Sequence, residues 1–253
     1  MAHYFDIVVS RNGIKSQVTM ADSDHCTFET KGYLTIGNAL SSDELHALNA
    51  ALNRKFSDRR DTFYSRTEQT YQSVRVLEVE TAFDTLIMHP SNFDILNALM
   101  DRDIALSELS VIIKEPHAKA HTAWHKDADY KGARLTHSVL LISCMYYLTV
   151  VPPAGACFTV VPGSHRSNRD RPDVERLEDM PAHMKLNGKT GTAIIFNTNL
   201  WHAAMADHAG IQRRTVHIYY FHPWMKPTGH TKFPPRLLES ADTPFLQKFY
   251  HTN

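Results

Sequence analysis

Cysteine, net charge and long apolar runs are all scarce in this chain of 253 residues. Its three cysteines, Cys26, Cys144 and Cys157, are too few and too scattered for a disulfide framework or a cysteine-based zinc site. Lysine plus arginine number 27 and aspartate plus glutamate number 27, a balance that disfavours a general nucleic-acid-binding protein. No apolar run reaches the length of a bilayer span, and the first residues lack the pattern of a signal peptide. We therefore expect a soluble, cytoplasmic protein without a nucleic-acid or membrane partner.

Helix signals are concentrated in the N-terminal third of the chain. Ser41 and Glu44 have the spacing of a capping box, and the apolar residues that follow recur every three or four positions. This spacing predicts one helix from Ser41 onward. A second helix is predicted after residues 89–91, where Pro90 suits a first turn. Most of the predicted strands follow these two helices, and we expect the helices to pack on the outside of the strand-rich core.

From about residue 72 the apolar pattern changes to that of β-strands. Short alternating or continuous apolar runs are separated by turns that contain proline and glycine. The predicted strands are residues 73–80, 109–114, 136–150, 156–161, 192–197 and 214–222. This order predicts an α+β, mainly β fold in a single domain, residues 1–253. Its jelly-roll, cupin-like core covers roughly residues 72–222, with flanking N-terminal helices.

The 16 histidines are the compositional oddity, and imidazole is the commonest metal ligand in proteins. His125 and Asp127 are two positions apart, so on a strand they project from the same face. His202 lies in a later strand-rich region, and Arg213 follows it. Two histidines and one carboxylate on one face of an octahedral ion leave three positions open, as in non-haem Fe(II) oxygenases. An arginine in the same barrel offers a planar fork for the carboxylate of a keto acid.

Three segments carry a family resemblance: TAWHKDADY at 122–130, ACFTVVPGSHRS at 156–167, and the run from Gly191 to Phe221. In order and spacing they resemble the phytanoyl-CoA dioxygenase family of Fe(II)- and 2-oxoglutarate-dependent oxygenases. The resemblance implies a double-stranded β-helix that uses Fe(II), 2-oxoglutarate and O₂. It also implies the site residues: the iron ligands His125, Asp127 and His202, and Arg213 for the distal carboxylate of 2-oxoglutarate.

The co-substrate contacts leave alternatives open. Adjacent strand residues face opposite sides, so one of Arg213 and Arg214 enters the barrel. The family spacing of 11 residues after the distal histidine favours Arg213, whereas a bulge would favour Arg214. Relatives often carry serine where this chain has Ala204, so either another donor compensates or the co-substrate is held less tightly. The candidates are Thr192, Thr215 and Tyr219, and Lys114 is a further candidate contact for 2-oxoglutarate.

The retained Asp127 favours hydroxylation over halogenation, because halogenating relatives replace this carboxylate with glycine or alanine. We expect a C–H bond of a small organic molecule as the target, in keeping with natural-product biosynthesis. One alternative is a cupin-like protein that binds a metal or small molecule without turnover. Another is a zinc hydrolase in which His117, His121 and His125 line one helix face, although Thr122 stands where the general-base glutamate belongs.

Several residues are candidates for contact with the substrate. As strand residues, His117 and His121 would share the face of His125 and line the pocket mouth; otherwise they are structural histidines. Tyr130 and His165 are two further candidates for substrate contact. The arginines in the N-terminal third either favour an acidic substrate or form a solvated face; they are Arg59, Arg60, Arg66 and Arg75. Neither substrate identity nor oligomeric state follows from the sequence.

Overall fold

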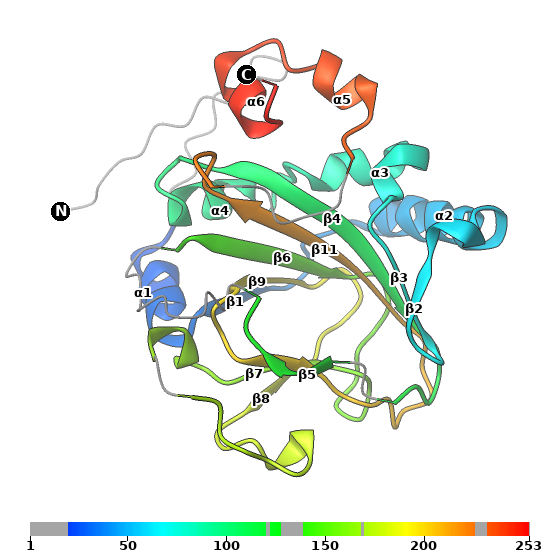
Figure 1. Cartoon of the computed structure of the whole chain (residues 1–253), viewed down its shortest axis with the longest axis vertical. Helices are drawn as coiled ribbons and strands as arrows, with labels where there is room; N and C mark the ends of the chain where they lie inside the picture. The colour runs from blue at the N-terminus through cyan, green and yellow to red at the C-terminus, as the bar shows by residue number, and fades with distance from the viewer. Residues whose placement is uncertain (1–19, 120–121, 128–138, 168–169, 226–231, 253) are drawn as a thin grey trace.

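The computed structural model of the chain describes residues 20–119, 122–127, 139–167, 170–225 and 232–252. The candidates His121 and Tyr130 lie outside these ranges. Two antiparallel sheets face each other, with the smaller sheet below the larger one in Figure 1. The order of the larger sheet is β1-β9-β6-β11-β4-β3-β2, and the order of the smaller is β5-β10-β7-β8. This pair of facing sheets confirms the predicted jelly-roll core.

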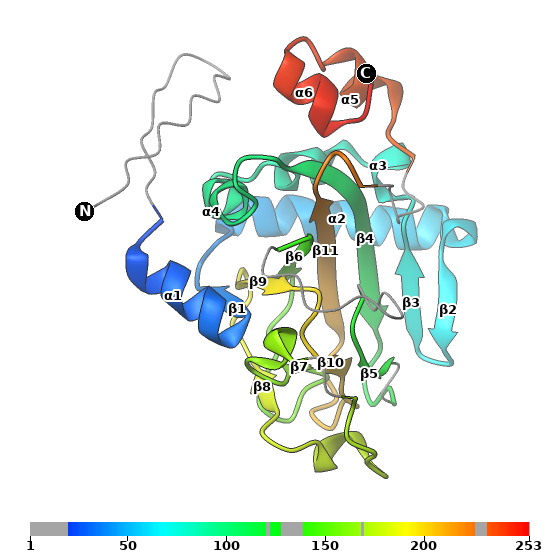
Figure 2. The same cartoon turned by 60° about the vertical axis from the view of Figure 1, so that its left-hand side comes forward.

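The strands of the larger sheet are β1 Tyr33–Ile36, β2 Tyr64–Thr67, β3 Thr70–Ser73, β4 Ala105–Lys114, β6 Leu141–Tyr147, β9 Ala193–Asn197 and β11 Arg213–Phe221. Those of the smaller sheet are β5 Thr122–His125, β7 Phe158–Val160, β8 Met184–Leu186 and β10 His202–Ala204. The β2–β3 hairpin extends the larger sheet beyond β4 (Figure 2). The predicted strands at 109–114, 156–161, 192–197 and 214–222 are thereby confirmed within a few residues, as is the described part of 136–150.

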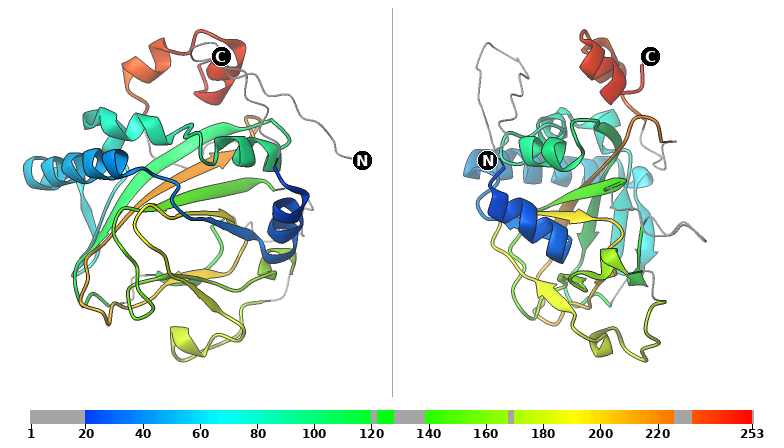
Figure 3. Two further views of the ribbon diagram at one scale, coloured as in Figure 1. Left: turned by 180° about the vertical axis from the view of Figure 1, so that it is seen from behind. Right: turned by 90° about the vertical axis from the view of Figure 1, so that its left-hand side faces the viewer.

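Helices cover the outer face of the larger sheet, as the view from behind shows (Figure 3). The α-helices are α1 Asp22–Lys31, α2 Ser42–Asp58, α3 Val76–Val79, α4 Phe93–Leu99, α5 Pro235–Glu239 and α6 Pro244–Phe249. Short 3-10 helices occupy Arg60–Thr62, Thr81–Leu86, Ser164–Arg166 and Leu177–Asp179. Within the described ranges no helix is long and apolar enough to cross a membrane. The two predicted N-terminal helices correspond to α2 and α4, whereas α1, α5 and α6 were not predicted.

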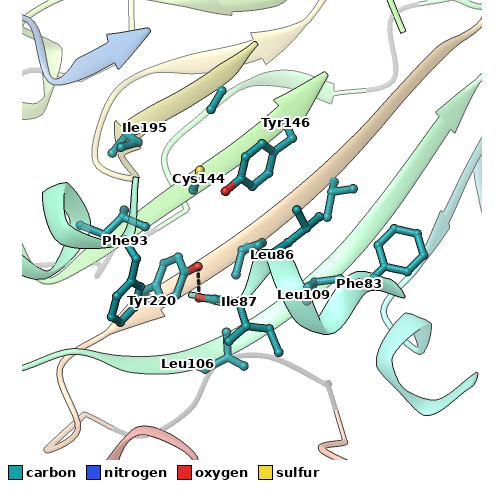
Figure 4. Packing of buried hydrophobic residues seen from close by; sticks show 14 of the residues in the cluster. Phe83, Leu86, Ile87, Phe93, Leu106, Leu109, Cys144, Tyr146, Ile195 and Tyr220 are labelled. Atoms are coloured by element: carbon teal, nitrogen blue, oxygen red, sulfur yellow. Dashed lines mark hydrogen bonds between the residues drawn. The ribbon is translucent and has the colours of Figure 1, made fainter. Parts of the chain in front are cut away.

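The principal core lies between these helices and the larger sheet (Figure 4). Alternate residues of β11, Val216, Ile218 and Tyr220, are buried in it. The Tyr220 hydroxyl donates a hydrogen bond of 2.8 Å to the carbonyl oxygen of Ile87, which satisfies the polar end of this buried ring. The intervening residues of β11 therefore face the smaller sheet, because successive side chains of a strand point to opposite faces.

The prediction of a strand over residues 73–80 is wrong. β3 ends at Ser73, and Val76–Val79 form the short helix α3. Val76 and Leu77 are adjacent and both fully buried, which a strand with one exposed face does not allow. The ammonium group of buried Lys55 donates to the carbonyl oxygen of Arg75 at 3.2 Å, and this contact holds the turn against α2. Tertiary packing thus overrides the local alternation.

The capping box predicted for α2 is present. The Ser41 hydroxyl accepts the Glu44 backbone N–H at 3.3 Å, and the Ser41 backbone N–H donates to the Glu44 carboxylate at 2.8 Å. We expect Ser41→Ala to lower the free energy of unfolding by about 1 kcal/mol. Urea denaturation measures this loss, with Ser42→Ala as the matched control inside the helix. An equal loss in both variants would contradict a capping role for Ser41.

Candidate metal centre

The three predicted metal ligands come together although they are far apart in sequence. His125 ends β5, His202 begins β10, and the two histidines are direct cross-strand partners. Side chains opposite each other on adjacent antiparallel strands have Cβ atoms about 5 Å apart. Asp127 follows two residues later, and its backbone N–H donates to the carbonyl oxygen of Thr198 at 3.0 Å. Strand register and one loop hydrogen bond therefore bring the three side chains together.

The ligand atoms of these residues surround one point. Nε2 of His125 lies 3.2 Å from Oδ1 of Asp127, and Nε2 of His202 lies 3.5 Å from the same oxygen. All three ligand atoms lie within 4.8 Å of one another. In the part of the chain that the structure describes, this is the one group of three or more metal-ligating side chains with such spacing. The arrangement has room for a single cation.

Both imidazoles are oriented by main-chain carbonyl groups. Nδ1 of His125 lies 2.8 Å from the carbonyl oxygen of Ala123, and Nδ1 of His202 lies 2.8 Å from that of Leu200. A carbonyl oxygen only accepts, so each Nδ1 carries a hydrogen and each neutral ring presents the Nε2 lone pair. Two lone pairs then face the carboxylate of Asp127. Such a set of acceptors requires a positive charge between them, a metal ion or a proton.

The protonation of Asp127 fits this electrostatic picture. Burial alone would raise its pKa, but the neighbouring His202 and His125 outweigh burial and hold the pKa well below its usual range. For His125 burial lowers the pKa, and the hydrogen bond and charge of Asp127 reverse this, so that the pKa is raised overall. The carboxylate is therefore ionised, as a metal ligand must be.

A pocket with about 560 Å³ of empty space, partly open to solvent, leads to this cluster. It is lined by Arg66, Gln72, Ser110, Ile112, Thr122, His125, Asp127, Phe158, Phe196, His202, Ala203, Ala204, Arg213, His217 and Tyr219. The larger sheet contributes most of the polar side chains of the wall. Phe158 and Phe196 pack against the His202 ring, with centroid distances of 5.4 and 5.3 Å.

Arg213 extends into this pocket and Arg214 does not. Arg213 is 3% exposed, and one of its Nη groups donates to the carbonyl oxygen of Ala156. Its Nε is buried without a hydrogen-bond partner in the described part of the chain. Arg214 instead donates to Gln212 at 2.6 Å and Asn49 at 3.2 Å. Of the two predicted alternatives, Arg213 is thus the residue with an unused donor beside the pocket.

Lys114 is the cross-strand partner of Arg213 and is fully buried. Its ammonium group donates to the carbonyl oxygen of Met205. Burial lowers the pKa of Lys114 to about 7, and the charge of Arg213 contributes in the same direction. Lys114 is therefore an interior group beside Arg213 rather than a solvated lysine at the end of a strand.

The candidates that could compensate for Ala204 lie in different places. Ala204 itself and Tyr219 line the pocket. The Thr215 hydroxyl is 3.1 Å from Nε2 of His217 and is thus already paired. Thr192 lies in the turn before β9, beside Gly188, and is not among the residues that line the pocket. Tyr219 is the one of the three whose side chain reaches the pocket wall.

The two substrate candidates within the described ranges, His117 and His165, are not among the residues that line the pocket. His117 is exposed in the loop after β4, with a φ of 62°, and its backbone N–H donates to Asp207. His165 lies in a 3-10 helix, and its Nε2 is 3.1 Å from the carbonyl oxygen of Glu29 at the end of α1. The zinc-hydrolase alternative also fails structurally, because it required a helix where Thr122–His125 form strand β5.

Three polar residues of the pocket, Gln72, Ser110 and His217, were not predicted. Ser110 belongs to β4 and His217 to β11. Polar and apolar residues alternate over residues 215–219 of β11, whereas residues 111–113 of β4 are all apolar. A reading of residues 213–221 by alternation would have assigned Arg213, His217 and Tyr219 to one face. Gln72 gives no comparable signal, because the predicted strand began at residue 73 whereas β3 spans Thr70–Ser73.

Burial of Lys114 makes the folding stability depend on pH. Its pKa is lower in the folded than in the unfolded chain, so unfolding takes up a proton between about pH 7 and the ordinary lysine value. Protonation therefore favours the unfolded state, and the contribution of Lys114 to folding stability rises with pH across this window. Urea denaturation at pH 7 and pH 9 should show a smaller rise in Lys114→Met than in the wild type. The exposed Lys185→Met is the control, and an unchanged pH dependence in Lys114→Met would contradict the shift.

Comparison with known proteins agrees with this geometry. The family model described as phytanoyl-CoA dioxygenase matches residues 28–215. HygX from Streptomyces hygroscopicus, solved with nickel, 2-oxoglutarate and hygromycin B bound, has a TM-score of 0.69 at 14% identity. The match covers 82% of this chain and 90% of HygX.

Two further solved structures share the fold. The carbocyclase SnoK from nogalamycin biosynthesis, described as non-haem and α-ketoglutarate-dependent, has a TM-score of 0.67 at 19% identity. This match covers 81% of this chain and 85% of SnoK. EctD from S. alaskensis, in its apo form, has a TM-score of 0.69 at 19% identity and covers 84% of this chain and 82% of its own. The family match spans well over half of the sequence, and the chain therefore belongs to the phytanoyl-CoA dioxygenase family of Fe(II)- and 2-oxoglutarate-dependent oxygenases.

Proposed function

We propose that the protein hydroxylates a C–H bond of a small organic molecule, with His125, Asp127 and His202 as the ligands of its Fe(II). The observation that carries this proposal is the convergence of two oriented Nε2 atoms and one ionised carboxylate in the pocket. Two imidazoles and one carboxylate are the donor set of the facial triad, which leaves coordination positions open for a co-substrate. Bound iron and 2-oxoglutarate would supply the oxidising chemistry, using O₂.

Arg213 holds the distal carboxylate of 2-oxoglutarate in this proposal. Its support is the unpartnered, buried Nε, a donor that costs free energy until it finds an acceptor. A guanidinium group presents parallel donors to a carboxylate and keeps its charge when buried. Lys114 adds a second cationic group beside it. Thr192, which does not line the pocket, is given no part in this contact.

Other pocket residues position the ligands and exclude water. Burial raises the pKa of Tyr219, and the nearby carboxylate of Asp127 contributes further. Tyr219 therefore keeps its proton and can donate a hydrogen bond to Asp127. Phe158 and Phe196 restrict the His202 ring and form an apolar surface next to the cluster. Burial lowers the pKa of His217 to about 3, so its ring is neutral in the pocket wall.

Hydroxylation is the reaction we propose within the oxygenase class, because Asp127 fills the ligand position that halide occupies in halogenating relatives. A role in natural-product biosynthesis is supported by two similar structures, one described with hygromycin B bound and the other as a protein of nogalamycin biosynthesis.

We also propose that residues 1–253 form one domain, since one apolar cluster joins α2, β4, β11 and the C-terminal α6.

The reaction type is tested by incubating the Fe(II)-loaded protein with 2-oxoglutarate, O₂ and a panel of small metabolites. Succinate formation reports turnover, and mass spectrometry reports the product. Hydroxylation adds one oxygen atom, epimerisation leaves the mass unchanged, and ring closure removes two hydrogen atoms. A product without added oxygen would contradict hydroxylation. A protein that binds metal and panel members but forms no succinate would instead be the binding module considered above.

Asp127 is the carboxylate of the proposed ligand set. We expect Asp127→Ala to weaken Ni(II) binding, measured by calorimetry, and to lower succinate formation by more than about 100-fold. The loss of the charged donor explains both effects. The matched control is Asp179→Ala, which removes an exposed carboxylate paired with Arg176. Wild-type activity in Asp127→Ala would refute the ligand assignment.

Replacement of the two neighbouring arginines tests the co-substrate contact. Arg213→Ala should raise the KM for 2-oxoglutarate by roughly 10- to 100-fold, the value of a charge-assisted hydrogen bond. Arg214→Ala, which removes an arginine bound to Gln212 and Asn49, should leave that KM within about 2-fold of the wild type. Steady-state kinetics measures both, with thermal denaturation to verify folding. A larger effect in Arg214→Ala would reverse the assignment.

A further inference from the structure

Arg66 is a pocket residue to which the proposed reaction assigns no role. It lies on β2, in the hairpin that extends the larger sheet, and it lines the pocket together with the metal-ligand cluster. The residue is exposed, so a solvated surface arginine is the alternative interpretation. Three observations favour a binding role. Hydrogen bonds hold the side chain of Arg66, its charge lies at the pocket, and the proposed metal and co-substrate leave this charge unbalanced.

Two buried polar side chains hold the guanidinium group in place. One Nη of Arg66 donates to Oε1 of Gln72 at 2.7 Å, and Nε2 of Gln72 donates to the Ser110 hydroxyl at 3.3 Å. Gln72 is 7% exposed and Ser110 is 1% exposed. A surface arginine does not need such support, whereas a binding residue requires a fixed orientation. A guanidinium group carries five N–H groups, and the hydrogen bond to Gln72 uses one of them.

The charge of Arg66 lies at the pocket. Arg66 lines the same pocket as the metal-ligand cluster, His217 and Tyr219. Within the described ranges Arg66 forms no ion pair. Glu108, the cross-strand partner of Tyr219, is the acidic group that faces this part of the wall from β4. Arg66 is thus a fixed cation beside the metal-ligand cluster.

Arg66 and Arg213 lie on different strands of the wall. In the larger sheet β2, which carries Arg66, is separated from β11 by β3 and β4. Three strand spacings place β2 and β11 roughly 14 Å apart across the sheet. In the proposed enzyme Asp127 and one carboxylate of 2-oxoglutarate would balance the charge of the metal ion, and the distal carboxylate of 2-oxoglutarate would balance Arg213. The charge of Arg66 then remains available for another ligand.

We propose that Arg66, held by Gln72, binds an anionic group of the substrate, a carboxylate or a phosphate. This inference rests on the proposed function, because it assigns the substrate class of the same pocket. The anion is bound by Arg66 on the β2–β3 hairpin, so that the rest of the molecule extends toward the metal-ligand cluster. A bidentate contact with the guanidinium group would also fix the orientation of the substrate.

The test uses full-length protein loaded with Ni(II) and 2-oxoglutarate, as wild type, Arg66→Gln, Arg66→Lys and Arg59→Gln. Arg59, an exposed arginine paired with Asp61 just before β2, is the matched control. Calorimetric binding of Ni(II) and 2-oxoglutarate is measured first and should be the same in all four proteins. Failure of the wild type to bind them refutes the proposed function itself. Weaker 2-oxoglutarate binding in Arg66→Gln alone assigns Arg66 to the co-substrate and overturns the present inference.

Binding of benzoate, phenyl phosphate and neutral benzamide to the loaded proteins is then measured by calorimetry. We expect at least one anion to bind the wild type about 10-fold or more tightly than benzamide, and Arg66→Gln to abolish this difference. Arg66→Lys should restore part of it, because the charge is kept, and Arg59→Gln should retain all of it. The tighter of the two anions identifies the group. Equal binding of all three probes, no anion binding, or unchanged selectivity in Arg66→Gln each overturns the proposal.

Discussion

The pairing of β5 with β10 is the constraint on which the site depends. This short antiparallel contact makes His125 and His202 cross-strand partners and places their rings 4.1 Å apart, centroid to centroid. A shift of either strand by one residue would turn its histidine to the other face. The main-chain carbonyl groups of Ala123 and Leu200 then orient the rings. The backbone register of β5 and β10 therefore fixes the relative positions of the two histidines.

The second organising feature is the two-sided character of β4 and β11. One face of β11 carries Val216, Ile218 and Tyr220 into the core under the helices. The other carries Arg213, His217 and Tyr219 into the pocket. The helices bury enough apolar area to hold the strands rigidly, so the polar face is presented from a fixed support. Stability and chemistry are therefore divided between opposite faces of the same strands.

Cationic and anionic groups lie on different sides of the pocket. Arg213 and Lys114 form a cationic pair on one side, the ionised Asp127 lies beside the two histidines, and Arg66 adds a cation on the hairpin. Burial strengthens these interactions, because charges in the interior are weakly screened. A dianionic co-substrate and an anionic substrate are both compatible with this distribution.

The sequence by itself determined the fold class, the three side chains that converge in the pocket and the residues of the capping box. These features depend on local periodicity, on turn residues and on motifs whose order resembles one family. It did not separate Arg213 from Arg214, nor did it identify Lys114 as an interior group. Both depend on which face of a strand is covered by another sheet. The sequence also assigned residues 73–80 to a strand, although Val76 and Leu77 are buried together on α3. Alternation along β11 groups His217 with Arg213 and Tyr219, but it does not say which face of the strand another sheet covers. Only the tertiary structure decided which polar residues reach the pocket, because the positions of Gln72 and Ser110 depend on cross-strand pairing between distant segments.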